Sequence, residues 1–317
     1  MVGIKDIAKK AGVSISTVSY ALNGSPKVTD ATRQRIVAIA DELNYIPNMA
    51  ARTLKTQKTK IVGIYLANYS GVFYGELLHG LTDTLLAKGY ELIVCSGMKA
   101  HRFLPERMID GAIILDRGFS TEELLEYADR GHKIIVLDRE VEHPNVRQVL
   151  LDNKAGATLA IDYLKTGFTG KFYIVTGPTN TYDSEERLRA ALSELERFRD
   201  EEVIVIPGDF SKATGEKAAQ QMEREWTGEP VAVFALNDEM AIGMYSYFAK
   251  TQLVIGRDVK IIGFDNTEVG QYLHPRLATI EYSKYKWGAV AAEKLLKLLE
   301  DETVEDEIIY TSLIPSN

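Results

Sequence analysis

The chain has 317 residues, 45% hydrophobic and 26% charged, which is enough for a small module joined to a larger globular body. No apolar run approaches the roughly 18 residues needed to span a membrane, and the start has neither the apolar core nor the cleavage site of a secretion signal. The single cysteine, Cys95, excludes an internal disulfide and any cysteine-cluster metal site. These features predict a cytoplasmic protein.

The net charge of −8 conceals an uneven distribution. Residues 1–60 contain ten Lys and Arg against four Asp and Glu, a charge of +6, which leaves −14 for residues 61–317. A basic head can neutralise phosphates and release counterions, whereas an acidic body repels nucleic acid. The split favours contact between the first 60 residues and nucleic acid.

Three short helices are predicted in the head. Apolar residues at helical spacing predict the first over residues 4–11, and Gly12 ends it. Ser14 is placed to cap a second helix, and Thr29 to cap a third. A tight turn before a helix that opens with polar side chains is typical of a helix-turn-helix, although a generic helical hairpin would show the same pattern.

From residue 60 onward, short β-rich runs alternate with amphipathic segments. The expected strands include Ile61–Leu66, Glu91–Cys95, Ala112–Leu115, Ile134–Leu137, Phe172–Val175, Val203–Ile206, Ala232–Ala235 and Lys260–Gly263. The expected helices include Leu77–Lys88, Ala155–Thr166, Arg187–Phe198, Glu239–Lys250 and Trp287–Leu299. This alternation predicts parallel sheets with helices on both faces, arranged as two doubly wound lobes. Ligands of such lobes bind beyond the carboxyl ends of the strands.

The head resembles a known family. Residues 4–23 (IKDIAKKAGVSISTVSYALN) are similar to the headpiece of LacI/GalR-family repressors, and the likeness runs on to about residue 299. It implies a small all-α helix-turn-helix headpiece (1–47), a hinge helix and linker (48–60) and a two-lobed α/β body (61–317). That body would resemble periplasmic binding proteins, with doubly wound parallel sheets, and would bind an effector and dimerise.

The resemblance also implies DNA contacts. Ile15, Ser16 and Tyr20 take the base-reading positions, where a hydroxyl can bond several bases and an isoleucine can touch a thymine methyl. Leu54, in the hinge helix, is expected to wedge into the minor groove and kink the duplex, although it could be an ordinary linker leucine. Further expected DNA-binding residues are Thr17 and Ser19, as phosphate or positioning contacts, and Ser14, Asn23, Ala51 and Lys55. One recognition helix spans few base pairs, so a dimer on a pseudo-palindrome is expected.

Polar residues that follow strands of the body match the family's effector pocket. Sugars and other polyols are bound by carboxylates, amides and guanidinium groups together with an aromatic face. The residues implied by the resemblance are Phe73, Tyr74, Asp138, Arg187, Phe210, Asn237 and Asp265.

Alternatives stay open for several of these residues. Asn237 and Asp265 could cap the segments that follow them. Arg187 could be a solvated helix charge, with Arg189 as the competing pocket residue. The adjacent aromatic pair at residues 73–74 could belong to the core.

The chain departs from the family pattern in two places. Only residues 96–108 connect Cys95 to Ile109, where the family has a full helix and a longer connection, so the shape of the pocket there is expected to differ. Residues 187–191 lack the glycine and aromatic of the family pattern, so the packing behind the arginine must differ.

The patterns of dinucleotide-binding, P-loop, zinc-protease and serine-hydrolase sites do not occur, and the five histidines lack metal-ligand spacing. We therefore expect no catalysis, no cofactor and no metal. The resemblance implies a transcriptional repressor controlled by a small effector, a sugar or sugar derivative. Its expected partners are operator DNA and a second copy of the chain, with a protein corepressor as an open question. Alternatives are a cytoplasmic sugar-binding protein and a sugar-active enzyme on the same fold.

Overall fold

The structure is a computed structural model that describes residues 2–46, 57–67, 73–166, 168, 170–197 and 202–316. It contains two compact units, which divide between Thr59 and Lys60. No helix among the described residues is long and apolar enough to cross a bilayer.

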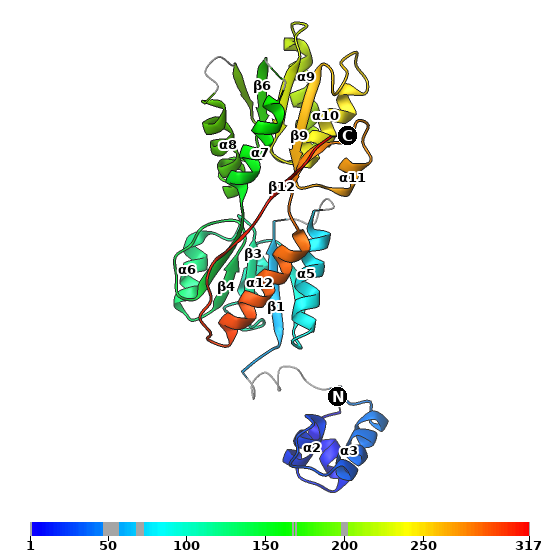
Figure 1. Cartoon of the computed structure of the whole chain (residues 1–317). Helices are drawn as coiled ribbons and strands as arrows, with labels where there is room; N and C mark the ends of the chain where they lie inside the picture. Colours follow the sequence, from blue (N-terminus) through cyan, green and yellow to red (C-terminus); the bar gives the residue numbers. More distant parts are fainter. Residues whose placement is uncertain are drawn as a thin grey trace. The chain divides into compact units, whose positions relative to one another are not determined.

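The smaller unit packs three helices around one apolar core (Figure 1). They are α1 (Ile4–Ala11), α2 (Ile15–Leu22) and α3 (Asp30–Glu42). Helix α1 ends at Gly12, whose φ of +65° lies in the left-handed region that glycine adopts at little cost. Ser14 and Thr29 each accept a hydrogen bond from the backbone N–H three residues further on, which caps α2 and α3. The glycine stop and both predicted N-caps are confirmed.

Among its described residues, the larger unit contains two sheets of six strands. The first has the order β11-β5-β4-β3-β1-β2, and the second β12-β10-β9-β8-β6-β7. The strands of the first sheet are β1 (Ile61–Leu66), β2 (Glu91–Cys95), β3 (Gly111–Leu115), β4 (Lys133–Val136), β5 (Val146–Leu151) and β11 (Glu307–Ile309). Those of the second are β6 (Lys171–Val175), β7 (Val203–Ile206), β8 (Val231–Ala235), β9 (Val259–Phe264), β10 (Ala278–Glu281) and β12 (Ser312–Ile314). Strand β12 runs antiparallel to β10, and the other paired strands are parallel.

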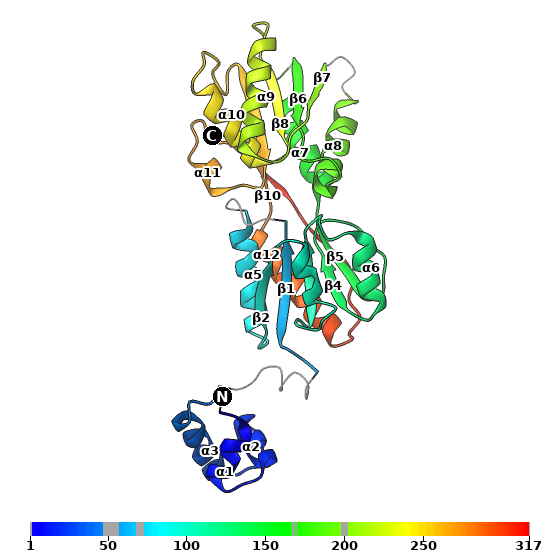
Figure 2. The same cartoon turned by 180° about the vertical axis from the view of Figure 1, so that it is seen from behind.

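Helices cover both faces of each sheet (Figures 1 and 2). The first sheet packs against α5 (Tyr74–Leu86) and α12 (Lys284–Leu299) on one face, and against α6 (Thr121–Asp129) on the other. The second sheet packs between the pair α7 (Asn153–Lys165) and α8 (Tyr182–Leu195) and the pair α9 (Lys212–Glu225) and α10 (Asp238–Phe248). A short helix, α11 (Glu268–Gln271), follows β9. The predicted doubly wound fold class is confirmed.

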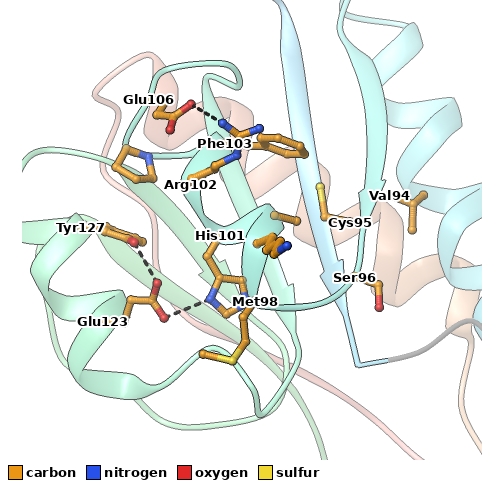
Figure 3. Close-up of a pocket in the computed structure, with 13 residues that line it drawn as sticks. Val94, Cys95, Ser96, Met98, His101, Arg102, Phe103, Glu106, Glu123 and Tyr127 are labelled. Atoms are coloured by element: carbon orange, nitrogen blue, oxygen red, sulfur yellow. Dashed lines mark hydrogen bonds and ion pairs between the residues drawn. The ribbon is translucent and has the colours of Figure 1, made fainter.

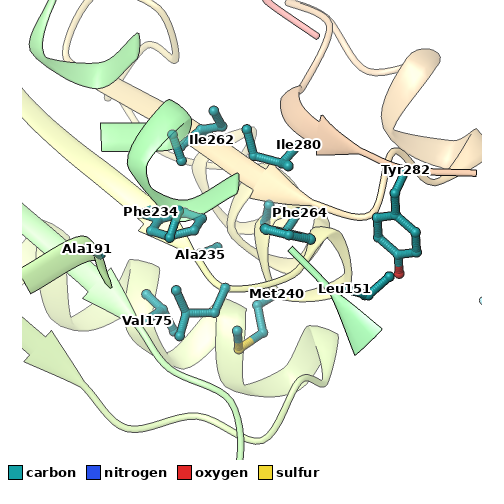
Figure 4. Packing of buried hydrophobic residues seen from close by; sticks show 14 of the residues in the cluster. Leu151, Val175, Ala191, Phe234, Ala235, Met240, Ile262, Phe264, Ile280 and Tyr282 are labelled. Atoms are coloured by element: carbon teal, nitrogen blue, oxygen red, sulfur yellow. The ribbon is translucent and has the colours of Figure 1, made fainter. Parts of the chain in front are cut away.

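The strands carry the apolar residues that fill these layers. Buried Val175, Phe234 and Ile262 lie on neighbouring strands of the second sheet, and Figure 4 shows them packed together. In the first sheet, the side chains of successive residues point to opposite faces, so Ile64 packs toward α5 and α12 while Tyr65 packs toward α6. The sheets are therefore buried on both sides, as parallel sheets require.

The segment between β2 and β3 is short. It contains one 3₁₀ helix, η1 (Met98–Phe103), where the sequence departs from the family pattern. Figure 3 shows η1 next to the end of β2 and near α6.

The chain passes between the two lobes of the larger unit three times. The passages connect β5 to α7, β10 to α12, and β11 to β12. Aromatic rings pack edge to face beside these passages. The ring centres of Phe73 and Trp287 lie 6.4 Å apart, and those of Trp287 and Tyr282 lie 5.9 Å apart. The Tyr282 ring lies 6.0 Å from Phe264, at the end of β9. This row of rings joins the cores of the two lobes.

The contact between α5 and α12 gives a test of the packing. A Cβ at Gly80 would lie 2.0 Å from the backbone oxygen of Tyr285, and that oxygen cannot move unless α12 moves with it. A Cβ at exposed Gly75 would meet nothing within 4 Å. Gly80→Ala should lower the free energy of unfolding by about 1–3 kcal/mol, as overpacking does. Gly75→Ala, on the same helix, should leave it unchanged or raise it by up to about 1 kcal/mol. Urea denaturation of both variants checks this, and equal effects would contradict the close helix contact.

Candidate functional site

Helix α2 begins with three hydroxyl groups in contact. The Ser14 Oγ lies 2.8 Å from both the Ser16 Oγ and the Thr17 Oγ1, and it accepts a hydrogen bond from the Thr17 backbone N–H. Beside them the Ile15 side chain is 46% exposed. A helix N-terminus with exposed hydroxyls attracts phosphate, and an exposed apolar side chain among them can contact a base.

The second half of α2 holds the other predicted recognition residues. Tyr20 is half-buried, and the Lys27 Nζ lies 5.0 Å from the centre of its ring. The Asn23 Nδ2 donates a hydrogen bond to the Ser19 backbone oxygen at 2.7 Å, so this amide helps to end the helix. The predicted DNA contacts from Ser14 to Asn23 therefore lie on one helix and its two caps. The predicted contacts Ala51, Leu54 and Lys55 lie outside the described residues.

In the body, Asp265 is the centre of a buried polar cluster. It follows β9 directly, is 5% exposed and has a φ of +118°. Its Oδ1 accepts a hydrogen bond from the Tyr282 hydroxyl at 3.0 Å, and its backbone oxygen accepts one from the Lys284 Nζ. Burial raises the pKa of the Asp265 carboxyl, and the charges of Arg187 and Lys284 oppose that rise. The pKa of the Tyr282 hydroxyl is raised by burial and by the Asp265 charge, so Tyr282 remains a donor.

Arg187 belongs to this cluster. Its side chain projects from α8 and is 3% exposed, and its guanidinium carbon lies 3.6 Å from the centre of the Phe264 ring. The Nε donates to the Asn153 Oδ1 at 2.8 Å, and an Nη donates to the Leu236 backbone oxygen at 2.7 Å. The interpretation of Arg187 as a solvated helix charge is wrong, because the neighbouring strand ends enclose it. Arg189 is the exposed one and pairs with Glu186 on its own helix.

Asn237 and Phe210 support the same strand ends. The Asn237 Oδ1 accepts a hydrogen bond from the Met240 backbone N–H, so the alternative that it caps a helix is confirmed. Its Nδ2 donates to the Phe210 backbone oxygen at 3.0 Å. Phe210 has a φ of +68°, and its ring lies so close to Gly177 that a Cβ there would approach it to 2.2 Å. Asn237 therefore fixes the loop that carries Phe210.

The remaining predicted residues come from the first lobe. Asp138 follows β4 and forms a two-point ion pair with Arg139, at 2.8 and 3.0 Å. Burial raises the pKa of its carboxyl, and Arg139 opposes this. Phe73 and Tyr74, at the start of α5, are half-buried against the core, with ring centres 5.1 Å apart.

A polar cavity of about 380 Å³ adjoins the Asp265 cluster. Its lining includes Tyr282 and Lys284 together with Glu76 from the start of α5. Residues of both lobes therefore contribute to it. Sequence reasoning did not identify these three residues or Asn153. The signal for Lys284 was hidden, since a lysine in a helical segment ordinarily indicates a solvated face.

Asp238 lies beneath the loop that carries Asp265. It is fully buried and accepts hydrogen bonds from the Thr267 backbone N–H at 2.7 Å and from the Thr279 hydroxyl at 2.6 Å. Burial, and then the charge of Asp265, raise the pKa of the Asp238 carboxyl to about 7. Asp238 thus connects α10, the β9–α11 loop and β10.

Two family models match the chain. Residues 3–48 match "Bacterial regulatory proteins, lacI family", and residues 162–315 match "Periplasmic binding protein-like domain". Among the described residues, no three His, Cys, Asp or Glu side chains are grouped so as to hold a metal ion.

Curated relatives match nearly the full length. The chain is 32% identical to the HTH-type transcriptional repressor PurR of Vibrio atlanticus, over 97% of this chain and 95% of that protein. It is 31% identical to the probable HTH-type transcriptional repressor ExuR of Bacillus subtilis, over 98% of this chain and 95% of that protein.

Solved structures agree with this match. A sugar-binding transcriptional regulator of the LacI family from Enterococcus faecalis is 52% identical, with a TM-score of 0.77 over 81% of this chain and 97% of that one. The Lac repressor bound to ONPG in the repressed state has a TM-score of 0.87 over 99% of this chain and 98% of that one. Since it is 24% identical, that second likeness shows the fold alone.

The contrast between Arg187 and Arg189 gives a matched test of the cluster. Arg187→Met removes a buried cation beside Asp265 and should lower the free energy of unfolding by about 3–5 kcal/mol, because a buried carboxylate loses its compensation. Arg189→Met removes an exposed charge and should change it by no more than about 0.5 kcal/mol. Chemical denaturation measures both. Similar small losses in the two variants would refute the buried position of Arg187.

The pKa of Asp238 predicts a pH dependence. The folded chain binds this proton more tightly than the unfolded chain, so stability falls as pH rises from about 4 to about 7, by at most about 1.4 kcal/mol per pH unit. Asp238→Asn should flatten this part of the stability profile, and exposed Asp162→Asn should keep it. Carbon-13 NMR of the Asp238 carboxyl in the unsubstituted chain is a direct check. A titration midpoint below 4 would contradict the buried, charge-coupled environment.

Proposed function

The chain belongs to the LacI family of bacterial regulatory proteins, and we propose that it represses transcription as a homodimer on a pseudo-palindromic operator, under the control of a small ligand. It is a DNA-binding transcriptional regulator. The observation that carries the proposal is the basic helix-turn-helix unit, in which α2 exposes Ile15 and a hydroxyl cluster. Its acidic counterpart, residues 61–317, is the proposed effector-binding body. DNA binding implies a cytoplasmic protein.

We propose the DNA contacts that the family resemblance implies. Ile15 and Ser16 contact base edges at the start of α2, together with Tyr20 one turn further on. Ser14, Thr17, Ser19 and Asn23 position the helix or contact phosphates. Residues 48–60 form the hinge, in which Ala51, Leu54 and Lys55 contact the minor groove and Leu54 is the wedge.

The ligand is a sugar or sugar derivative. The Asp265 carboxylate can accept hydrogen bonds from neighbouring sugar hydroxyls, and the Arg187 guanidinium can donate to them. Apolar faces for the sugar ring come from three half-buried aromatic side chains, Phe73, Tyr74 and Phe210. The 52% identical regulator from Enterococcus faecalis is described as sugar-binding, which supports this class.

Lys284 and Tyr282 join these residues in the proposed site. Asp138, already paired with Arg139, is proposed as a contact from the first lobe, and Asn237 holds the Phe210 loop. We propose binding without catalysis, in line with relatives that are repressors.

The proposal predicts sequence-selective, salt-dependent DNA binding. Selection from random duplexes should recover a pseudo-palindrome bound by two protomers, with affinity that falls steeply between two salt concentrations. Ile15→Ala should weaken binding to that duplex about tenfold, or about 1.4 kcal/mol, and should barely affect random duplexes. Val37→Ala, an equally apolar and 39% exposed position on α3, is the control. Recovery of no preferred sequence would refute the proposal.

The wedge role of Leu54 has a separate test. Leu54→Ala should weaken binding to the selected duplex at least tenfold, since the kinked duplex loses its apolar contact. Binding to random duplexes should stay the same. Mobility shifts on both kinds of duplex measure the difference, and an equal loss on both would show that Leu54 is an ordinary linker residue.

A further inference from the structure

The first lobe contains a cavity that the proposed function does not use. It has a volume of about 800 Å³ and lies between the end of β2, η1 and α6, on the face of the first sheet opposite α5 and α12. Figure 3 shows its lining, with His101, Glu123 and Tyr127 joined by hydrogen bonds. Ligand pockets commonly have volumes of about 300–1,000 Å³, so the cavity is large enough for a small molecule.

His101 is held firmly in the wall of this cavity. Its side chain is 4% exposed, and its ring stacks on Phe119 with the ring centres 4.1 Å apart and the planes at 19°. The edge of Tyr65 meets it at 5.8 Å. Its Nδ1 lies 3.0 Å from the Glu123 Oε2, and the Tyr127 hydroxyl donates to the Glu123 Oε1 at 2.8 Å. Stacking and hydrogen bonding together fix the ring plane and its rotation.

These contacts define what the other ring nitrogen can do. Because the Glu123 carboxylate accepts at Nδ1, that nitrogen carries the proton of the neutral ring, and Nε2 is left as an acceptor. The His101 Nε2 is buried and has no hydrogen-bond partner among the residues that the structure describes. An unsatisfied buried acceptor costs about 1–3 kcal/mol, so a donor that reached it would gain a strong contact.

The rest of the lining combines apolar walls with charged side chains, among them Lys99 and the ion pair of Arg102 with Glu106. Val94, Phe103 and Pro105 provide apolar walls, and the guanidinium of Arg102 lies 5.6 Å from the Phe103 ring. We propose that this cavity is a second ligand site, which binds a small planar aromatic molecule through one N–H or O–H group that donates to the His101 Nε2.

The lining includes one flexible side chain. Met98 lies beside the His101 ring in Figure 3 and is 78% exposed. Its side chain is unbranched and has three rotatable bonds, so it can turn away at little cost. After that movement, its sulfur can contact the edge of the bound aromatic ring.

The test uses the full chain and two probes that differ in one donor. Indole has an N–H group, and 1-methylindole lacks it. Isothermal titration should show saturable binding of indole and at least tenfold weaker binding of 1-methylindole. His101→Phe keeps a ring to stack on Phe119 but removes the acceptor, so it should remove the preference for indole. His79→Phe, at an exposed histidine of the same lobe, should preserve it.

A variant at the cavity mouth keeps the test decisive if His101→Phe does not fold. Ser96 is exposed and lines the cavity, so Ser96→Trp should fill the space and abolish indole binding without disturbing the core. Absence of saturable indole binding to the unsubstituted chain would overturn the proposal. So would equal affinity for the two probes, a preference that survives His101→Phe, or undiminished binding to Ser96→Trp.

Discussion

The body depends on one buried charge cluster at the ends of its strands. Asp265 at the end of β9 is accompanied by Arg187 from α8 and Lys284 from α12. A lone carboxylate at this depth would cost several kcal/mol, and it is tolerated because cations and a hydroxyl surround it. Since α12 packs on the first sheet and β9 belongs to the second, the cluster ties the two lobes at the place where the chain passes between them.

This constraint supports the proposed role of the cluster in regulation. The cluster combines one carboxylate with two cations, and Lys284 reaches Asp265 from α12, so a ligand hydroxyl that bonds Asp265 would alter contacts on elements of both lobes. A ligand that prefers one lobe arrangement shifts the population toward it by its differential binding energy. The same energy appears as a change in DNA affinity, because coupling between two binding sites is reciprocal. Asp238 fixes the loop that carries Asp265, since it accepts two hydrogen bonds from Thr267 in that loop and a third from Thr279 on β10.

Local sequence patterns were sufficient for much of the fold. Buried parallel strands such as β1 and β8 are continuous apolar runs, and the predicted strands lie within one residue of the observed ones. Strand β5 (VRQVLL) was not among the named strands, and polar residues interrupt it. Helix α9 (KATGEKAAQQMERE) was not among the named helices, and its buried face consists mainly of small side chains. Ser14 and Thr29 were predictable as caps because capping is a local interaction.

The site was harder to predict, because it depends on the orientation of whole elements. Arg187 and Arg189 are two residues apart, about 200° around a helix, so only one can face inward. Their sequence does not reveal which, and the ring of Phe264 at the end of a distant strand decides it. Lys284 was missed for the same reason. Its neighbours indicate an amphipathic helix, and its burial follows only from the position of Asp265.

In the proposed mechanism, ligand binding at Asp265 controls the affinity of the chain for operator DNA. The most direct measurement begins with a sugar that raises the Tm of the full chain. This sugar is titrated into the complex of the chain with the selected operator, and fluorescence anisotropy reports how much operator stays bound. Operator affinity should change at least fivefold for the unsubstituted chain. Asp265→Asn, which keeps the shape of the side chain, should still bind the operator but should lose both the Tm shift and the change in affinity. A sugar that binds both chains equally, or that leaves operator affinity unchanged, would contradict the account.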